Sequence, residues 1–551
     1  MKRHIHFVAY RKVYNWTIKY VALLFICALI GFCSVYIYFF YSDATIGENI
    51  VVEPFQISKP VEKVQFTGKK FVHLDLKGAP PKISYYEYLF PLLFNSGVGG
   101  VVIEYEDTFP FEGNLSNISA LNAYTRSDID MINILADTNK LEIIPLVQTF
   151  GHLEFVLKLE EFKELREVPI YPQEICPSHE KSLPLLTEML TQIIDAHPFT
   201  EKIHIGADET HHVGRCKECT RRMKLEHITT DGLYIKHVKK IRDFLRRKYP
   251  LLKIFMWDDQ LRNFSEEETL NELDKLDIIP VVWQYNTDVF NTLGPSLWSQ
   301  YSKVFPNVWI ASAFKGATGV DQYIVDVSHY NQNHRSWLDV VENYKFLMKF
   351  DAIILTGWQR YDHFSILCEL LPVGLPSLLM NLKILEGELD NRVGPTKEVA
   401  HILHCRQPYG LMGPAFGSPR CKFPGSDILE NAYRLHRLNE DYNELKRSSV
   451  MRGWVTNYNI LYNFTNPYHF YNIAPQLNHL ENEVLEIEND MSKALLNVYD
   501  EYTKDEWILT YINPLKKEIQ ELIRVKDQLL DRDVWPRRPL KLEVPKEQQR
   551  T

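Results

Sequence analysis

Eight short runs of β-branched and other apolar residues recur along the first two thirds of the chain, and segments with helical periodicity separate most of them. Short apolar runs are typical of buried strands, and their alternation with amphipathic helices is typical of a parallel sheet. The predicted strands are residues 72–76, 100–105, 141–147, 202–206, 253–256, 278–282, 307–311 and 352–356. The clearest helical patterns are residues 127–139, 181–196, 231–248, 265–276 and 337–349.

Eight strand–helix units over residues 71–386 predict an α/β fold, a closed (β/α)8 TIM barrel. Residues 42–70 have no sustained periodicity and are interpreted as a stem. Residues 387–551 form a helical C-terminal region. Its long helical patterns either fold back on the barrel or form a coiled coil for oligomerisation, and the first is favoured because the apolar spacing is not a sustained heptad.

The N-terminus has the pattern of a membrane anchor. Residues 20–41 are uncharged and mostly apolar, which is enough to span a bilayer as one helix. Residues 1–19 carry five basic and no acidic side chains, so we expect them to be a cytoplasmic tail. A cleaved signal peptide is the alternative, but the apolar run is longer than is usual for one. The prediction is an uncleaved transmembrane signal anchor and hence a single-pass type II membrane protein of the secretory pathway, facing the Golgi lumen.

Sequons and cysteines agree with a luminal location. Asparagines 114, 117, 263 and 463 stand in Asn-x-Ser/Thr triplets, and six cysteines follow the apolar segment. Cys216 and Cys219 form a Cys-x-x-Cys that could be half of a zinc site. No second such pair or spaced histidine pair completes it, so disulfides or free thiols are preferred, and no metal or cofactor is predicted.

The overall charge excludes one class of function. Acidic residues number 71 against 62 basic ones, a net charge of −9, and there is no basic stripe. Neither a Walker loop nor a dinucleotide fingerprint occurs, so nucleic acids and nucleotides are not expected as ligands.

Adjacent carboxylates, Asp208 and Glu209, directly follow the predicted strand at residues 202–206. On its own such a pair is more often a solvated loop or a helix N-cap than a catalytic site. The other strand ends change this interpretation, because in a barrel they meet at one rim, and here they bring acids and three tryptophans whose flat faces suit a sugar ring. These residues are Lys77, Glu106, Asp107, residues 148–152, Trp257 to Asp259, Trp283 to Tyr285, Phe314, Lys315 and Trp358 to Arg360.

The run from His204 to Glu209 resembles the His-x-Gly-x-Asp-Glu signature of family 20 glycoside hydrolases, the β-N-acetylhexosaminidases. Residues 77–82, 103–112 and 145–152 resemble the hexosaminidase D branch of that family. The similarity covers about residues 70–385, with several motifs in barrel order.

The resemblance implies a retaining, substrate-assisted reaction in which the 2-acetamido group of the sugar attacks its own anomeric carbon. Glu209 matches the general acid and base, with an expected raised pKa, and Asp208 matches an ionised residue that stabilises the acetamide. Residues that match the substrate-binding positions are Asp107 (with Glu106 as a rival), His152, Trp257, Trp283 and Trp358.

The sequence departs from the family pattern in two places. Lys77 stands where an arginine commonly binds the sugar, and the tyrosine expected after the seventh strand is missing, with Tyr285 or Tyr361 as replacements. Two functions therefore remain open: an active exo-enzyme that removes terminal GlcNAc or GalNAc from glycans, and a carbohydrate-binding barrel that has lost the chemistry. Retention of both Asp208 and Glu209 favours the enzyme.

Overall fold

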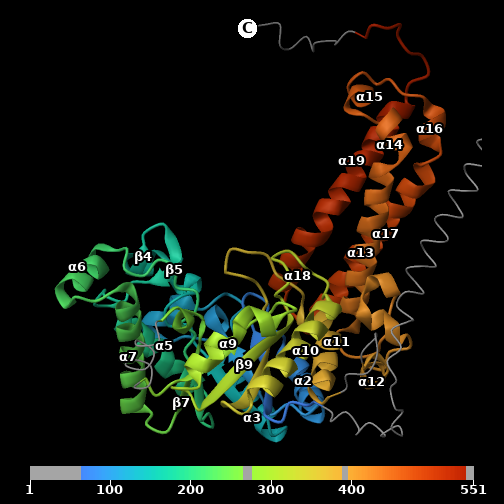
Figure 1. The fold of residues 1–551 in the computed structure, drawn as a ribbon. Coiled ribbons are helices and arrows are strands. Elements are labelled where there is room, and N and C mark those ends of the chain that lie inside the picture. Colours follow the sequence, from blue (N-terminus) through green and yellow to red (C-terminus); the bar gives the residue numbers. More distant parts are fainter. Residues whose placement is uncertain (1–63, 265–275, 388–394, 541–551) are drawn as a thin grey trace, which may run out of the picture. The chain divides into compact units, whose positions relative to one another are not determined.

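Eight parallel strands close into a barrel in the computed structural model, which describes residues 64–264, 276–387 and 395–540 (Figure 1). The order around the barrel is β1-β10-β9-β8-β7-β6-β3-β2, so neighbours in the barrel are also successive barrel strands along the chain. The predicted (β/α)8 barrel is confirmed. Its strands are β1 (Lys69–Asp75), β2 (Gly100–Glu104), β3 (Glu142–Leu146), β6 (Lys202–His204), β7 (Lys253–Trp257), β8 (Ile279–Trp283), β9 (Asn307–Lys315) and β10 (Lys349–Gly357).

Both faces of the strands are buried, which explains why the runs are mostly apolar and do not alternate regularly with polar residues. Phe71 belongs to a cluster of barrel residues that includes Val102 and Trp257. The next residue, Val72, points the other way and belongs to the large cluster that also holds Leu89 of a surrounding helix.

Helices follow the strands and cover the outside of the barrel (Figure 1). One predicted helix has different bounds in the structure. The helix predicted at residues 337–349 begins ten residues earlier and ends at Tyr344. The Asp326 side chain accepts the N–H of His329 and starts that helix, while Lys349 already pairs with the neighbouring strand. The main barrel helices are α2 (Ile83–Asn95), α3 (Arg126–Thr138), α5 (Ser182–Asp195), α7 (Thr230–Lys248), α9 (Val289–Tyr301), α10 (Val327–Tyr344) and α11 (Leu371–Leu385).

Two insertions lie near the C-terminal ends of the strands. A hairpin of β4 (Arg166–Val168) and β5 (Tyr171–Ile175) follows the short helix α4 (Glu154–Leu157) between β3 and α5. Helix α6 (Lys217–Glu226) follows the loop after β6.

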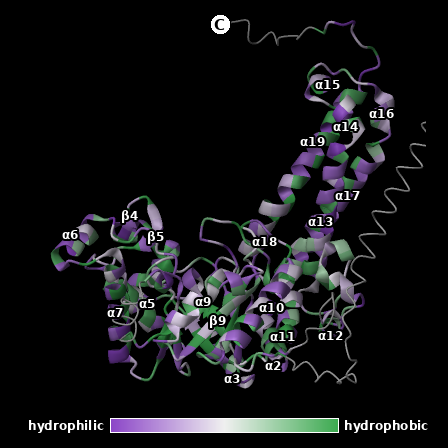
Figure 2. Cartoon of the chain, in the orientation of Figure 1, coloured by the Kyte–Doolittle hydropathy of each residue, from purple (hydrophilic) through white to green (hydrophobic). Residues whose placement is uncertain are grey.

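Beyond the barrel the chain is helical, and three long helices run side by side (Figure 1). Their buried residues recur at helical spacing, and polar residues alternate with these apolar ones along each ribbon in Figure 2. The region contacts the barrel, since Lys82 N donates to Val498 O and Leu371 N donates to the Tyr499 hydroxyl. The region therefore contacts the barrel at one end of these helices, which project away from the barrel in Figure 1 instead of folding back over it. They are α12 (Thr396–Ile402), α13 (Ser426–Arg447), α14 (Ser449–Trp454), α15 (Asn457–Leu461), α16 (Pro467–Tyr471), α17 (Ala474–Val498), α18 (Glu501–Trp507) and α19 (Asn513–Leu530).

Several predicted segments lie outside the described residues: the tail at 1–19, the anchor at 20–41, the stem up to residue 63 and the helical pattern at 265–275. Among the residues that are described, no helix is long and apolar enough to cross a membrane. Cys405 and Cys421 form a disulfide. The other four cysteines of the described part are free thiols, namely Cys176, Cys216, Cys219 and Cys368.

Candidate active site

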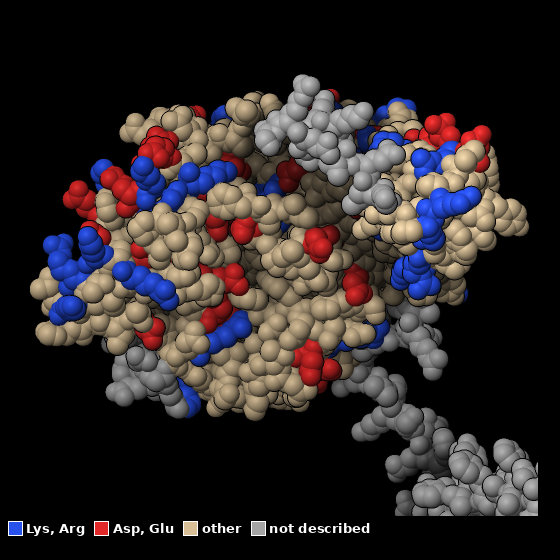
Figure 3. All heavy atoms as spheres, turned by 90° about the horizontal axis from the view of Figure 1, so that it is seen from above, with Lys and Arg blue, Asp and Glu red and all other residues tan. Residues whose placement is uncertain are grey.

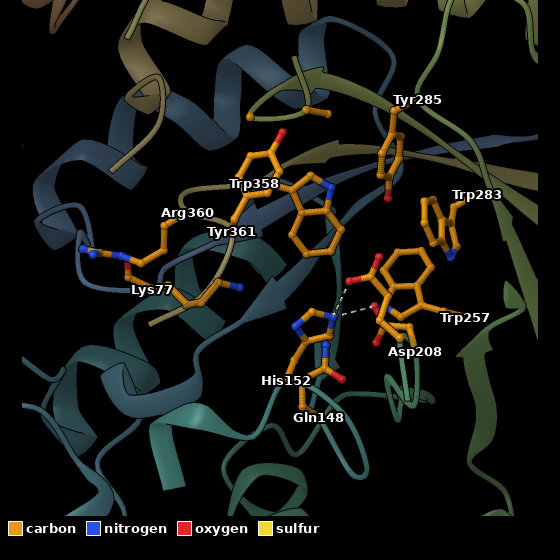
Figure 4. Close-up of a pocket in the computed structure, with 13 residues that line it drawn as sticks. Lys77, Gln148, His152, Asp208, Trp257, Trp283, Tyr285, Trp358, Arg360 and Tyr361 are labelled. Atoms are coloured by element: carbon orange, nitrogen blue, oxygen red, sulfur yellow. Dashed lines mark hydrogen bonds and ion pairs between the residues drawn. The ribbon is translucent and has the colours of Figure 1, made fainter. Parts of the chain in front are cut away.

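The C-terminal ends of the barrel strands surround a cavity of about 230 Å³ (Figure 4). Of the residues predicted for the site, all except Asp107 line it. The lining consists of Lys77, Gln148, His152, Asp208, Glu209, Trp257, Trp283, Tyr285, Gly316, Ala317, Trp358, Arg360 and Tyr361.

The acid pair sits on a tightly turned segment. β6 ends at His204, two residues before the end of the predicted run, because the chain turns at Gly206 (φ 62°) and Ala207 (φ 68°). Glu209 also has a positive φ of 47°, a conformation that is uncommon for residues other than glycine and concentrates at functional sites. At Gly206 a side chain would overlap Gln148 Oε1, so only glycine fits this turn.

The Glu209 backbone is held from the next strand. Its N–H donates to Asp259 Oδ2 at 2.9 Å, and the other oxygen of Asp259 accepts the Trp283 indole N–H at 3.4 Å. One carboxylate outside the cavity lining therefore orients both a catalytic candidate and a wall of the cavity.

His152 links the two acids. Its Nε2 lies 3.2 Å from Glu209 Oε2 and 3.5 Å from Asp208 Oδ2, and dashed lines mark both contacts in Figure 4. Burial lowers the pKa of His152, but the two carboxylates outweigh it and raise the pKa to about 10. The imidazole is therefore protonated at neutral pH.

The two carboxyl groups titrate in the opposite order to that expected from the sequence. The hydrogen bond from His152 holds the pKa of Glu209 below its usual value. Burial raises the pKa of Asp208 to about 7, against the attraction of His152 and with repulsion from Asp259 and Glu209 adding to it. The expectation of a raised Glu209 pKa beside a fully ionised Asp208 is wrong, because the hydrogen bond with His152 lowers the pKa of Glu209 while burial raises the pKa of Asp208.

Tryptophans form the walls of the cavity. Trp257 and Trp358 lie with ring centroids 6.0 Å apart, and the Trp257 indole N–H lacks a hydrogen-bond partner within the described part of the chain. The Oδ1 atom of Asp208 is also buried without a partner there. Buried polar atoms are normally paired, so these two atoms are suited to a polar ligand in an otherwise aromatic cavity.

Tyr285 lies between the tryptophans. Its ring stacks on Trp283 at 5.2 Å and meets Trp358 edge-on at 6.3 Å. In Figure 4 its hydroxyl points toward the space beside Asp208. Tyr361 is 42% exposed and lies on the side of the cavity nearer Arg360. Of the two replacements considered for the missing tyrosine, Tyr285 has the better placement.

Lys77 lines the cavity and also forms ion pairs with nearby carboxylates. Its Nζ lies 3.0 Å from Asp75 and 3.5 Å from Glu106, and 5.5 Å from the centroid of Trp358. Burial lowers the pKa of Lys77, but the nearby carboxylates outweigh it and raise the pKa well above its ordinary value. Lys77 is therefore a permanent cation on one side of the cavity.

Arg360 also lines the cavity. The sequence places it among the strand-end residues, but no binding role was predicted for it. Its guanidinium donates to Lys77 O at 3.1 Å and to Glu506 of helix α18 at 2.9 Å. The C-terminal helices thus support this side of the cavity, a contact that strand periodicity could not have indicated.

Asp107 is placed away from the cavity lining, contrary to the prediction. Its Oδ2 lies 3.2 Å from Lys158 Nζ and 3.4 Å from His363 Nδ1, while the other nitrogen of His363 bonds to Glu106. The two acids after β2 are therefore engaged with groups from later loops. Among the described residues, Asp208 and Glu209 are the only carboxylates that line the cavity.

The surface charge agrees with a neutral or polar ligand. The face shown in Figure 3 carries scattered acidic side chains near its centre and basic ones mainly toward its edges, without a broad basic area. A strongly anionic polymer would need the opposite distribution.

Comparison with known proteins gives the family. The glycosyl hydrolase family 20 catalytic domain matches residues 104–294. Hexosaminidase D of Homo sapiens is 36% identical over 459 residues, covering 83% of this chain and 93% of that protein. The chain belongs to glycosyl hydrolase family 20.

Hexosaminidase D of Bos taurus is 43% identical over 326 residues, covering 59% of this chain and 94% of that protein. A solved β-N-acetylhexosaminidase from Bacteroides fragilis NCTC 9343 is 14% identical, with a TM-score of 0.45 over 61% of this chain and 70% of that one. This family 20 member is a glycoside hydrolase related to hexosaminidase D, so the identification made from its motifs is confirmed.

Proposed function

We propose that this family 20 protein is a retaining exo-β-N-acetylhexosaminidase that removes terminal β-linked GlcNAc or GalNAc from glycans. The observation that supports this most is that Asp208 and Glu209 both reach into one tryptophan-walled cavity and are its only carboxylates among the described residues. A retaining glycosidase that uses an enzyme nucleophile needs a second carboxylate about 5 Å away across the sugar. Two neighbours in sequence that contact one histidine instead suit a reaction in which the substrate supplies the nucleophile.

In the proposed reaction the acetamide oxygen attacks the anomeric carbon, the glycosidic bond breaks, and Glu209 protonates the departing oxygen. Asp208 accepts the acetamide N–H and stabilises the positive charge that develops on the cyclised acetamide. Water then opens this intermediate with Glu209 as the base, so two displacements give net retention. The Tyr285 hydroxyl is proposed to hold the acetamide oxygen in line.

The proton that Glu209 needs is supplied by His152 in this proposal. A site with protonated His152 and ionised Glu209 contains the same number of protons as one with neutral His152 and protonated Glu209. At a separation of 3.2 Å the proton can pass directly between them. A sugar that excludes water from Glu209 raises its pKa and favours the second arrangement.

The membrane context is also part of the proposal and has its support in the sequence. The apolar segment at residues 20–41 and the basic tail before it favour a type II anchor. The glycan substrates would then be those of the secretory pathway, with the Golgi lumen as the expected location.

The proposal is tested with the purified full-length chain and nitrophenyl β-glycosides of GlcNAc and GalNAc. Wild type should hydrolyse at least one of them, and Asp208→Asn should lose turnover while keeping the wild-type thermal midpoint. A wild-type protein that binds GlcNAc but hydrolyses neither glycoside would instead identify a carbohydrate-binding barrel.

A further inference from the structure

Three cysteines and a glutamate come together outside the sugar cavity, where the β4–β5 hairpin meets the start of helix α6. Their ligand atoms all lie within 4.8 Å of one another. We propose that this cluster is a structural zinc site. The four residues are Glu167, Cys176, Cys216 and Cys219.

The sulfur positions suit a shared metal better than a single covalent bond. Cys176 Sγ lies 3.1 Å from Cys216 Sγ and 3.5 Å from Cys219 Sγ, and all three are free thiols. A disulfide needs about 2.0 Å between sulfurs. Zinc–sulfur bonds of about 2.3 Å in a tetrahedron place the sulfurs about 3.8 Å apart, so a small outward shift would admit the ion.

Glu167 provides an independent observation. The residue is only 1% exposed, and the partners that its carboxylate has in the described part of the chain are a backbone N–H and a thiol rather than a cation. Its oxygens instead accept the Cys216 backbone N–H at 2.9 Å and face the Cys219 thiol at 3.2 Å. A buried carboxylate is costly without a cation, and a metal held by the adjacent thiolates would supply one.

The backbone is already arranged for thiolates. Cys216 is the N-cap of helix α6, and its sulfur accepts the Cys219 N–H at 3.2 Å. Both the N–H bond and the positive end of the helix stabilise negative charge on this sulfur. Spacing alone did not complete the Cys-x-x-Cys pair, because its partners Cys176 and Glu167 come from the hairpin 40 and 49 residues earlier.

The donor set indicates which metal would bind. Thiolates are soft ligands that select zinc over magnesium or calcium, and zinc takes four ligands in a tetrahedron. Three sulfurs and one carboxylate oxygen fill all four positions. A fully ligated ion has no open position for substrate, so the role is to hold structure.

The site would hold the segment that carries the catalytic acids. Strand β5 bonds on one side to the His152 segment, through Ile175 N to Phe150 O and Leu153 N to Gln173 O. On the other side Glu174 accepts the backbone N–H groups of His211 and His212, close after Glu209. A zinc ion that joins this hairpin to helix α6 would therefore restrict the motion of His152 and of the acid pair, Asp208 and Glu209.

The experiment measures zinc in the full-length protein, independently of glycosidase activity. The chain is expressed with zinc, purified under argon without chelator, and analysed by elemental mass spectrometry together with a count of alkylated thiols. We expect one zinc ion per chain and loss of the bound zinc in Cys176→Ser and Cys219→Ser. The matched control is Cys368→Ser, a buried free thiol outside the cluster, which should keep its zinc.

A second measurement uses wild-type protein, so that it stays informative if the cysteine variants fold poorly. Wild-type protein stripped with a thiol-reactive mercurial and a chelator, then reduced, should recover its thermal midpoint on addition of zinc but not magnesium. Cobalt in place of zinc should give the absorption of tetrahedral sulfur ligation. Metal-free wild type with full thermal stability, or a disulfide joining two of the three cysteines in the purified protein, would overturn the proposal. Because these readouts are zinc content, thiol state and stability, a failed glycosidase assay leaves them unaffected.

Discussion

Tyr285→Phe removes one hydroxyl from the cavity and leaves the aromatic packing in place. The phenylalanine ring keeps its contacts with Trp283 at 5.2 Å and Trp358 at 6.3 Å, so the walls of the cavity should not move. If the hydroxyl holds the acetamide oxygen during attack, its loss resembles the loss of one preorganised oxyanion donor. Such a loss lowers kcat by about 100- to 1,000-fold, or about 2.7–4 kcal/mol of transition-state stabilisation.

The assay is steady-state hydrolysis of nitrophenyl β-N-acetylglucosaminide at saturating substrate. Tyr361→Phe is the matched control, because this tyrosine also lines the cavity but is 42% exposed, and it should change kcat less than about threefold. The fall with Tyr285→Phe should appear in kcat more than in KM. An unchanged kcat for Tyr285→Phe, or an equal loss for Tyr361→Phe, would refute the assignment of the acetamide-orienting role.

Three further predictions concern the acid, the pH dependence and the membrane. Glu209→Gln should lose most turnover on substrates with poor leaving groups and far less on nitrophenyl glycosides, which need little protonation, and equal losses would argue against its role as the acid. Since Asp208 must be ionised and burial raises its pKa to about 7, kcat/KM should fall as the pH drops below about 7, and it should fall again toward pH 10 as His152 loses its proton. A profile that rises from pH 7 to pH 5 would contradict this. Carbonate-washed membranes should retain the full-length chain, and removal of N-glycans should increase its gel mobility, whereas a freely extracted, unshifted product would exclude the type II anchor.

The barrel and most of its rim could be predicted because both depend on local pattern. A strand buried on both faces is mostly apolar along its length. Because the barrel strands are parallel, the residues that follow them all lie at the same end of the barrel. From the sequence alone, this rule predicts that Trp257, Trp283 and Trp358 surround one cavity, with Asp208 and Glu209 beside them.

The errors arose where side chains from distant segments decide the outcome. Asp107 was expected to bind substrate, but Lys158 and His363 engage it, and neither is near it in sequence. The pKa order of the acid pair depends on the hydrogen bond between His152 and Glu209 and on the burial of Asp208, and no motif encodes either. Side-chain contacts between non-adjacent loops are therefore the part of the site that sequence pattern could not supply.

The central claim is that the substrate's acetamide is the nucleophile. It is tested most directly by comparing the hydrolysis of nitrophenyl β-N-acetylglucosaminide with that of nitrophenyl β-glucoside. Each reaction is measured in the presence and absence of a thiazoline analogue of the cyclised intermediate. The wild-type protein should hydrolyse only the acetamido sugar, the thiazoline should inhibit it competitively, and Asp208→Asn should weaken that inhibition. Equal hydrolysis of the plain glucoside, or covalent trapping of the protein by a fluorosugar, would contradict the account even though the fold and the family would stand.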